Sequence, residues 1–335
     1  MTILVTGATG FLGRSIIGAL QQAPGHEIVA QVRSAKNADA LRASLPADSR
    51  VTFVSANLLT RGDPARILRG IDVVIHAAAG MRGAPAEMYL NTVVATRNLL
   101  DAFKEAPQVR RIVLVSSFAV YGTHDLPRGA IVNEDTPLEA HPEWRDGYAL
   151  AKLHQEQLAR EKVAELGREL VVLRPGVIYG PGGSAFSNRV GVNMFGWMFH
   201  LGGSNKLPLS HVKNCADAIV LATTSPAAAG GTFNVHDDEL PSCGEYLRRF
   251  KRDVGGVRSI RVPYWMLMLG SRLVEGYHRK SRGQLPAAFT PYVTRSLYVG
   301  RRYDNSRLHS IGWKPRVSTA DGLKEMFGYL RGLRA

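Results

Sequence analysis

The segment that most constrains the fold is the run TGATGFLG at Thr6–Gly13. It directly follows an apolar run that indicates a buried strand and directly precedes an amphipathic stretch that indicates a helix. Three glycines at a spacing of three let a backbone turn tightly and approach a pyrophosphate, whose charge then lies at the helix N-terminus. Because the triplet stands between a strand and a helix, it is a stronger signal than glycines alone. The residues predicted to contact a dinucleotide here are Gly7, Thr9, Gly10, Phe11, Leu12 and Gly13.

Short apolar runs alternate with longer amphipathic stretches along the first half of the chain. The runs are rich in Val and Ile and lack polar alternation, which is typical of parallel strands covered on both faces. This rhythm predicts an α/β fold with a Rossmann-type doubly wound parallel sheet. We expect residues 1–175 to form a cofactor-binding domain, to which residues 212–235 return, and residues 176–335 to form a smaller C-terminal substrate-binding lobe. The predicted strands are Thr2–Thr6, Glu27–Arg33, Val51–Ser55, Asp72–His76, Arg111–Ser116, Glu169–Leu173 and Thr232–Val235, and the predicted helices are Phe11–Gln22, Glu87–Glu105, Arg145–Leu166 and Val212–Thr224.

The end of the second predicted strand bears on the choice of dinucleotide. An acidic residue usually stands there when NAD is bound, because it holds the ribose hydroxyls. Here the sequence is Gln31-Val32-Arg33-Ser34, which contains no carboxylate. Arg33 is placed to meet a 2′-phosphate, and Arg14, just inside the first helix, can add a second contact. The sequence therefore favours NADP over NAD.

A tyrosine and a lysine four residues apart, Tyr148 and Lys152, share one face of a predicted helix. A free tyrosine has a pKa of about 10 and is a poor base at neutral pH. A nearby ammonium and the positive ring of an oxidised nicotinamide favour the phenolate, which suits Tyr148 to general acid–base catalysis, and Lys152 can also hold the ribose. Ser116 and Ser117 end the preceding strand, and strand alternation points only one of them at the site. We expect Ser117 to orient the substrate oxygen.

A series of motifs then extends along nearly the whole chain. In the identity and order of these motifs, the chain resembles the extended short-chain dehydrogenase/reductases, the NAD-dependent epimerase/dehydratase superfamily. The motifs are TGATGFLG, HAAA (His76–Ala79), LNTVVATRNLL (Leu90–Leu100), VSSFAVYG (Val115–Gly122), YALAK, LRPGVIYGPG (Leu173–Gly182), HVKNCADAIVLA (His211–Ala222) and YDNSRLHSIGWKPRVSTADGL (Tyr303–Gly322).

The resemblance implies roles for several further residues. In that family the catalytic triad would be Ser117, Tyr148 and Lys152. The family usually has Asp against the adenine near the end of the third strand, where this chain has Asn57 followed by Leu58. Members often form homodimers through the helices that correspond to residues 90–105 and 146–165. The residues that would line the cofactor further along the chain are Ala77, Ala78, Pro175 and Val177.

The chemistry within this superfamily is narrowed by three local features. Phe118-Ala119-Val120 follows the serine without a carboxylate, which disfavours dehydration. Sugar-nucleotide enzymes often have an arginine at the position of Lys206, where its guanidinium binds the pyrophosphate through two hydrogen bonds. A lysine cannot bind in this paired way, which weakens the case for a sugar-nucleotide substrate. The C-terminal pattern resembles the 3-beta-hydroxysteroid dehydrogenase and dihydroflavonol reductase branch. We therefore expect an NAD(P)-dependent oxidoreductase that transfers hydride at a secondary alcohol or ketone of a small-molecule substrate, lipid-like or a sugar. The alternatives are a sugar-nucleotide epimerase with tightly bound NAD and a non-catalytic NADP-sensing scaffold.

Charge is unevenly distributed along the chain. The formal net charge is +14, and between Arg248 and Arg302 there are 13 basic residues against Asp253 and Glu275. Residues 262–282 combine Trp, Tyr, Leu and Met with basic flanks, which is typical of a segment at an anionic membrane surface. The alternative is a helix of the substrate lobe whose apolar side lies in the core.

Other function classes lack a motif in the sequence. No zinc-finger spacing, RNP-like motif or helix-turn-helix signal accompanies the basic charge, so nucleic-acid binding is not expected. Cys215 and Cys243 are far apart, no metal-ligand spacing is present, and no metal site is predicted. Strand-like residues begin at Thr2 without a secretory-signal pattern before them, which predicts a cytoplasmic protein. A peripheral position at the inner face of a membrane is the second hypothesis for its location.

Overall fold

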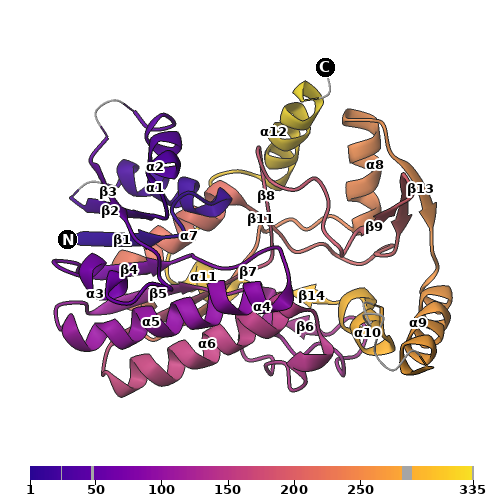
Figure 1. Cartoon of the computed structure of the whole chain (residues 1–335). Coiled ribbons are helices and arrows are strands. Elements are labelled where there is room, and N and C mark those ends of the chain that lie inside the picture. The colour runs from indigo at the N-terminus through magenta and orange to yellow at the C-terminus, as the bar shows by residue number, and fades with distance from the viewer. Residues whose placement is uncertain (24, 47–48, 281–288, 334–335) are drawn as a thin grey trace.

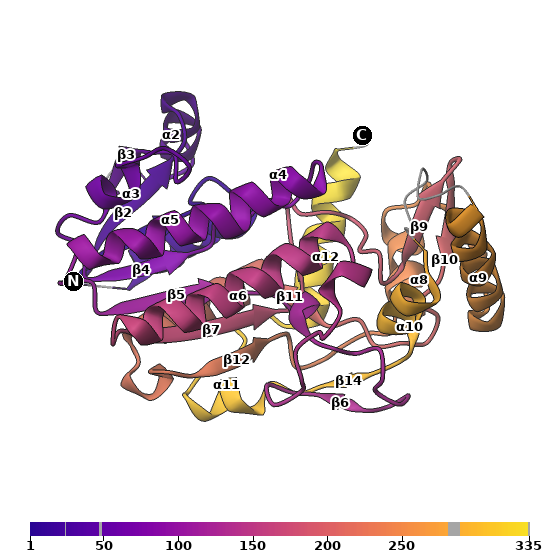
Figure 2. The same ribbon diagram turned by 60° about the horizontal axis from the view of Figure 1, so that its bottom comes forward.

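The computed structural model describes residues 1–23, 25–46, 49–280 and 289–333. Its centre is a parallel seven-stranded sheet in the order β12-β7-β5-β4-β1-β2-β3 (Figures 1 and 2). Chain order reverses between β1 and β4, and in sheets of this kind ligands bind in the crevice at the carboxyl ends of the strands on either side of that point. The predicted α/β fold with a Rossmann-type sheet is confirmed. The strands are β1 (Thr2–Thr6), β2 (Glu27–Val32), β3 (Val51–Ser55), β4 (Val73–His76), β5 (Arg111–Val115), β7 (Glu169–Pro175) and β12 (Thr232–Val235).

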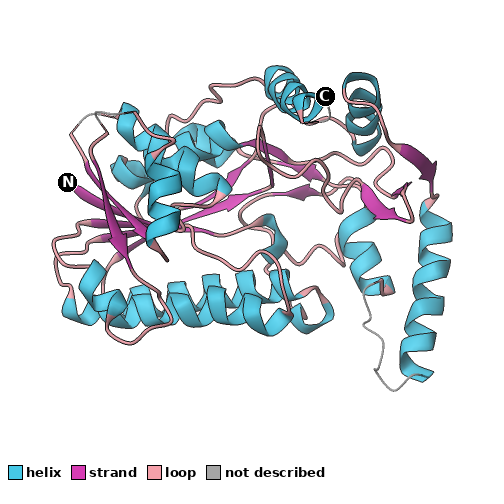
Figure 3. Ribbon diagram, turned by 45° about the horizontal axis from the view of Figure 1, so that its top comes forward, coloured by secondary structure: helices cyan, strands magenta, loops and turns pink. Residues whose placement is uncertain are grey.

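Helices cover both faces of this sheet (Figure 3). On one face α1 (Phe11–Gln22) and α7 (Val212–Thr224) pack over Ile3 and Val5 of β1. On the other face α5 (Ala95–Asp101) and α6 (Gly147–Glu165) enclose Leu4 and Val74. Burial on both faces explains why the strands read as continuous apolar runs. The smaller helices of this region are α2 (Ala35–Arg42), α3 (Asp63–Ile67), α4 (Pro85–Tyr89) and α11 (Ser306–Ser310), and the short 3-10 helices are Phe118–Val120, Pro142–Trp144 and Pro226–Ala228.

The predicted helix at Glu87–Glu105 is one continuous run built from four helical pieces. It begins two residues earlier, at Pro85, a residue well suited to a first helical turn. It then includes a π-helical turn at Leu90–Val94 and ends as a 3-10 helix at Ala102–Glu105. The other predicted strands and helices are confirmed to within two residues at each end.

The C-terminal part of the chain forms two small sheets with their own helices. A separate core contains Tyr179, Met198, Phe250 and Phe327. In the same region β14 (Arg302–Tyr303) pairs with β6 (Ile131–Val132). The division of the chain into two domains at residue 175 stays a prediction. Leu308 and Trp313 come after that boundary and pack in the same core as β1. The elements are β8 (Val177–Tyr179) paired with β11 (Leu209–His211), the sheet of β9 (Gly191–Met194), β10 (Trp197–His200) and β13 (Arg258–Arg261), and the helices α8 (Cys243–Asp253), α9 (Tyr264–Lys280), α10 (Pro291–Tyr298) and α12 (Thr319–Gly332).

None of the helices formed by the described residues has both the length and the apolar character that crossing a bilayer requires. Within the same residues, no group of three or more His, Cys, Asp or Glu side chains is arranged to hold a metal ion.

Candidate active site

The glycine turn is packed so closely that side chains would not fit. Gly7 has a left-handed φ of +69°, and a Cβ there would lie 2.8 Å from the backbone nitrogen of Ala78. A Cβ on Gly13 would lie 2.1 Å from the Gly7 carbonyl oxygen. The first turn of α1 contains no acidic residue, and Gly10 supplies no side chain to cap it. The free N–H groups at this helix end therefore fit the pyrophosphate of a dinucleotide.

Below the turn, a buried histidine joins β1, β4 and α5. His76 Nδ1 lies 2.7 Å from Thr6 Oγ1, and its Nε2 lies 2.8 Å from Thr96 Oγ1. Burial, with a smaller contribution from the charge of Lys152, lowers the pKa of His76 to about 3. The ring therefore stays neutral at physiological pH and holds the strand ends that carry the glycine turn and Ala78.

Lys152 points from α6 into the same region. Its Nζ donates to the Val115 carbonyl oxygen at 2.6 Å and to Gln155 Oε1 at 2.7 Å. Gln155 Nε2 in turn donates to Thr96 Oγ1 at 2.8 Å and lies 3.4 Å from the Ala78 carbonyl oxygen. Burial lowers the pKa of Lys152 to about 7, although the charge of Glu156 opposes this shift. A chain of polar contacts thus connects the lysine to the strand end beneath the glycine turn.

Tyr148 and the two serines lie at the start of α6 and the end of β5. Asp146 caps α6 by accepting a hydrogen bond from Ala149 N at 2.9 Å, so the first turn that holds Tyr148 is fixed. Burial raises the pKa of Tyr148, while a hydrogen-bonding interaction with Ser117 opposes the shift. Ser116 Oγ instead donates to Glu156 Oε2 at 2.6 Å. Of the two serines it is therefore Ser117 that interacts with the tyrosine.

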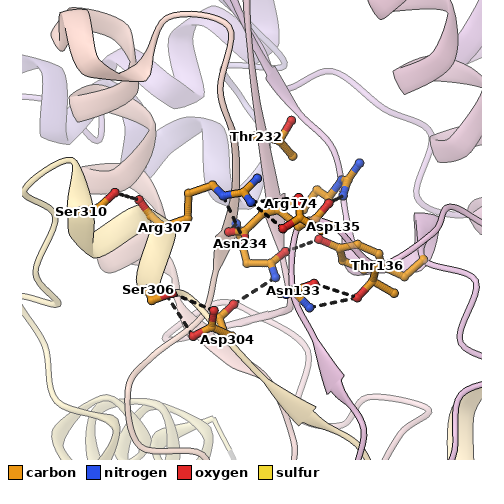
Figure 4. Close-up of polar contacts among 12 residues, drawn as sticks. Asn133, Asp135, Thr136, Arg174, Thr232, Asn234, Asp304, Ser306, Arg307 and Ser310 are labelled. Carbon is orange, nitrogen blue, oxygen red and sulfur yellow. Dashed lines mark hydrogen bonds and ion pairs between the residues drawn. The ribbon is translucent and has the colours of Figure 1, made fainter.

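A buried ionic network fixes α6 on the side away from the glycine turn. Glu156 is fully buried and accepts hydrogen bonds from Arg174 Nη2 at 2.6 Å and Nε at 3.1 Å through its two oxygens. The Arg174 guanidinium also lies over the Tyr121 ring, 4.7 Å from its centroid, and Tyr121 donates to Asn234. Figure 4 shows Arg174 and Asn234 between Asn133–Thr136 and the segment that carries Asp304. One turn beyond Lys152, α6 is thereby connected to β7 and β12. Asn234 Nδ2 also donates at 3.0 Å to the carbonyl oxygen of Asp304, the residue after β14.

The end of β2 is basic, as its sequence indicates. Arg33 is exposed, and Arg14 is exposed with its Nε donating to the Thr9 carbonyl oxygen at 3.2 Å. Lys36 is exposed in the first turn of α2. Gln31 is buried and bridges neighbouring segments, since its Nε2 donates to Ala56 O at 2.6 Å and its Oε1 lies 3.4 Å from Gly7 N.

The remaining predicted cofactor residues lie along the same sheet edge. Asn57 is exposed after β3, where its Oδ1 accepts from Leu59 N at 3.1 Å. Leu58 is buried in the core. Pro175 is buried at the end of β7, and Val177 begins β8, where its N–H donates to the Pro208 carbonyl oxygen at 2.7 Å.

Two polar residues of the site were missed by sequence reasoning. Gln155 lies three residues after Lys152 on the same helix face, and that spacing is the signal that could have found it. Asp63 accepts from Asn57 N at 2.8 Å and therefore places a carboxylate beside Asn57, six residues further along the chain. That contact depends on the turn between β3 and α3, which gave no pattern in the sequence.

Comparison with known proteins agrees with this geometry. A family model described as "NAD dependent epimerase/dehydratase family" matches residues 3–235, which include the glycine turn, Ser117, Tyr148 and Lys152. The chain belongs to the NAD-dependent epimerase/dehydratase family. Its fold and enzyme class are therefore those of an NAD(P)-dependent short-chain dehydrogenase/reductase-type oxidoreductase or epimerase.

Individual relatives in this family differ in what they act on. The chain is 26% identical to a UDP-glucose 4-epimerase of Vibrio cholerae, with 97% of this chain and 94% of the relative aligned. It is also 26% identical to a 3-beta-hydroxysteroid dehydrogenase of Mycolicibacterium neoaurum, with 99% and 92% aligned. The crystal structure of a UDP-glucuronic acid 4-epimerase from Bacillus cereus in complex with NAD superposes with a TM-score of 0.73 at 22% identity over the full length of both chains, which shows the shared fold.

Proposed function

We propose that this family member is an NADP(H)-preferring oxidoreductase acting on a secondary alcohol or ketone, with Tyr148 as the general acid/base. The observation that carries the proposal is the placement of Tyr148 beside Ser117, and of Lys152 within a polar chain that leads to the glycine turn. A sensor or scaffold has no need for this arrangement. The bound nicotinamide would donate or accept the hydride.

The residues of the chain would handle the proton and the substrate oxygen. Ser117 would donate a hydrogen bond to that oxygen and hold it against the Tyr148 hydroxyl. Tyr148 would give its proton to the oxygen during reduction and take it back during oxidation. Because burial raises the pKa of Tyr148, the phenolate needs a positive charge close by, and Lys152 supplies one when protonated.

Lys152 is held in a way that suits a second contact. An ammonium has three N–H donors, and two of them are directed to Val115 O and Gln155 Oε1. Among the contacts of the described residues, this leaves the third donor for a ribose hydroxyl of the cofactor. Gln155 would keep the amine at this position between turnovers.

The preference for NADP rests on the end of β2. Arg33 and Lys36 are exposed cations at the N-terminus of α2, and Arg14 is an exposed cation in the first turn of α1. Gln31, near the end of β2, brings no carboxylate. A 2′-phosphate would gain charge-assisted hydrogen bonds there, whereas the ribose hydroxyls of NAD would lack their usual acidic acceptor.

The sugar-nucleotide epimerase is the alternative, and one contact counts against it. Lys206, the candidate for holding a pyrophosphate, donates instead to the Leu240 carbonyl oxygen at 2.8 Å. An epimerase would also retain NAD tightly. A homodimer through residues 90–105 and 146–165 stays a prediction.

The test combines cofactor and turnover measurements on the purified protein. Native mass spectrometry should show no tightly retained NAD, and titration should show tighter binding of NADPH than of NADH. Arg33→Ala should reduce that preference by about tenfold, equivalent to about 1.4 kcal/mol. Arg69→Ala should not, because this exposed arginine precedes β4 at the amino end of the parallel sheet, whereas Arg33 follows the carboxyl end of β2. Retained NAD, or an unchanged preference in Arg33→Ala, would contradict the cofactor assignment.

Turnover is followed as NADPH oxidation over a panel of ketones. Tyr148→Phe should abolish it while leaving NADPH affinity within about threefold, because the phenol moves a proton and contributes little to binding. Tyr329→Phe, on the exposed side of α12, serves as the control. Full activity in Tyr148→Phe would refute the proposed mechanism, and NADPH binding without turnover of any ketone by the wild type would favour the sensor.

A further inference from the structure

Most of helix α9 is uncovered, although α10 packs against one side of it. Of its 17 residues only Ser271 is buried. Trp265 is 67% exposed, Leu273 68% and Tyr277 61%. None of its residues belongs to the core clusters formed by the described residues, so the sequence-based alternative that its apolar side lies in the lobe core is wrong.

The exposed apolar residues form a stripe along the helix. Trp265, Leu269, Leu273 and Tyr277 follow one another at intervals of four and so share one side. At a rise of about 1.5 Å per residue the stripe spans roughly 18 Å, and its area is on the order of several hundred Å². Patches of this size on soluble proteins mark interaction sites. The apolar face of α9 comprises Trp265, Met266, Leu269, Leu273 and Tyr277.

The charge around this face is positive. Arg272, Arg279 and Lys280 are exposed on α9, and the single acidic residue of the helix, Glu275, pairs with Arg279 at 3.4 Å. Bilayers with anionic headgroups attract such residues by about 1 kcal/mol for each Lys or Arg near the surface. A second copy of the chain would instead bring its own basic rim against this one, which disfavours self-association through the same face.

A cavity rich in arginine opens beside the start of α9. Its volume is about 380 Å³, and Arg128, Arg261 and Arg295 line it together with Tyr264. All three arginines are exposed. Guanidinium groups bind phosphate through paired hydrogen bonds, so the cavity fits the phosphate of a lipid headgroup next to the helix that would meet its acyl chains.

A second exposed apolar element lies at the same end of the molecule. The tip of the β9–β10 hairpin carries Phe195, which is 93% exposed and is the sole described non-glycine residue with a left-handed φ, +54°. β10 pairs with β13, which leads directly into α9. In Figures 1, 2 and 3 the hairpin and α9 both lie at the end of the molecule remote from the N-terminus and β1.

We propose that α9 lies in the surface of an anionic lipid bilayer, with its apolar face among the acyl chains and the Arg128–Arg261–Arg295 cavity on a lipid phosphate. Residues 281 and 282, at the end of the predicted membrane segment 262–282, lie outside the described residues. The proposal does not depend on the proposed catalytic function.

The test is co-sedimentation of the full-length protein with vesicles of phosphatidylcholine alone or mixed with phosphatidylglycerol, without dinucleotide. The wild type should pellet with the anionic vesicles only, and its binding should weaken at least about tenfold at high salt. Trp265→Ser with Leu273→Ser should weaken binding at least about tenfold, since both side chains are already in water in the free protein and their loss does not affect folding. Leu333→Ser, an exposed leucine at the end of α12, is the matched control.

A second pair of variants tests the cavity. Arg128→Ala with Arg261→Ala should weaken binding to anionic vesicles more than Arg69→Ala with Lys104→Ala, which removes the same charge elsewhere. If both double variants lose the same vesicle affinity, net charge alone explains the binding and the proposed headgroup site is overturned. Absence of wild-type binding would overturn the whole proposal, as would self-association in sedimentation velocity that the Trp265 and Leu273 changes abolish. Tyr148→Phe should bind vesicles like the wild type. A failure of the catalytic proposal can therefore be told apart from a failure of the membrane proposal.

Discussion

Replacing Glu156 by Gln should destabilise the protein strongly, although the change preserves the shape of the side chain. Burial alone raises the pKa of Glu156, but the hydrogen bonds and charge of Arg174, with Ser116 and Arg160, hold it below its ordinary value. A depressed carboxylate pKa means that the stabilisation is present above the ordinary range of glutamate and is lost as the pH falls through the folded-state value. At neutral pH the interaction therefore contributes in full.

The expected magnitude follows from what the substitution leaves behind. Arg174 is buried and keeps its charge, so Glu156→Gln leaves the cation facing a neutral amide in place of its carboxylate, with the Glu134 carbonyl oxygen and the Tyr121 ring as neutral neighbours. Breaking one side of a buried pair costs about 3–5 kcal/mol. Arg160 adds little, since its side chain is 40% exposed. Because α6 also carries Tyr148 and Lys152, turnover should fall together with stability.

Urea unfolding at neutral pH, followed by tryptophan fluorescence and circular dichroism, measures the loss. Glu161→Gln, an exposed glutamate on the same helix, is the control and should change the free energy of unfolding by less than about 0.5 kcal/mol. In combination with Arg174→Met, the Glu156 change should cost at least about 1 kcal/mol less than the sum of the two single changes. A loss below about 1 kcal/mol for Glu156→Gln would refute the view that this ion pair fixes α6.

Three further outcomes are expected. Gly13→Ala should abolish dinucleotide binding in calorimetric titration, because its Cβ would lie 2.1 Å from the Gly7 carbonyl oxygen. A Cβ on Gly18 in the same helix meets nothing within 4 Å, so Gly18→Ala should stabilise the protein by about 0.5–1 kcal/mol in thermal melts. Burial lowers the folded-state pKa of Lys152 to about 7. Between that pH and about pH 10 the lysine is protonated in the unfolded chain and neutral in the folded protein. The free energy of unfolding should therefore rise with pH in this range, by up to about 1.4 kcal/mol per pH unit. Lys152→Met should remove that slope in urea titrations at several pH values, and an unchanged slope would assign it to other groups. Arg111→Met should lower the free energy of unfolding by about 1–3 kcal/mol, because Arg111 Nη1 donates to three carbonyl oxygens at the end of α7 at 2.9–3.1 Å. Hydrogen exchange should then show faster exchange of the amides at that end of α7.

Elements that depend on neighbours in sequence could be predicted from the sequence. The apolar runs gave the strands of the large sheet, and the glycine spacing gave the turn before α1, because backbone sterics and hydrophobic periodicity act over a few residues. The shared face of Tyr148 and Lys152 follows from the helical repeat alone. The missing carboxylate after β2 is likewise a local property.

The tertiary structure decided which polar groups meet. Gln155 joins Lys152 to Ala78, 77 residues away in sequence from Gln155, and Glu156 meets Arg174 across 18 residues. Ser116 and Ser117 carry the same hydroxyl, and their different partners, Glu156 and Tyr148, come from another element, α6. The apolar pattern of α9 is compatible with a buried or an exposed helix, and its exposure depends on how the lobe packs. Local sequence limits each residue to a strand, turn or helix face, whereas burial and partnership arise from contacts between distant segments, which no short pattern encodes.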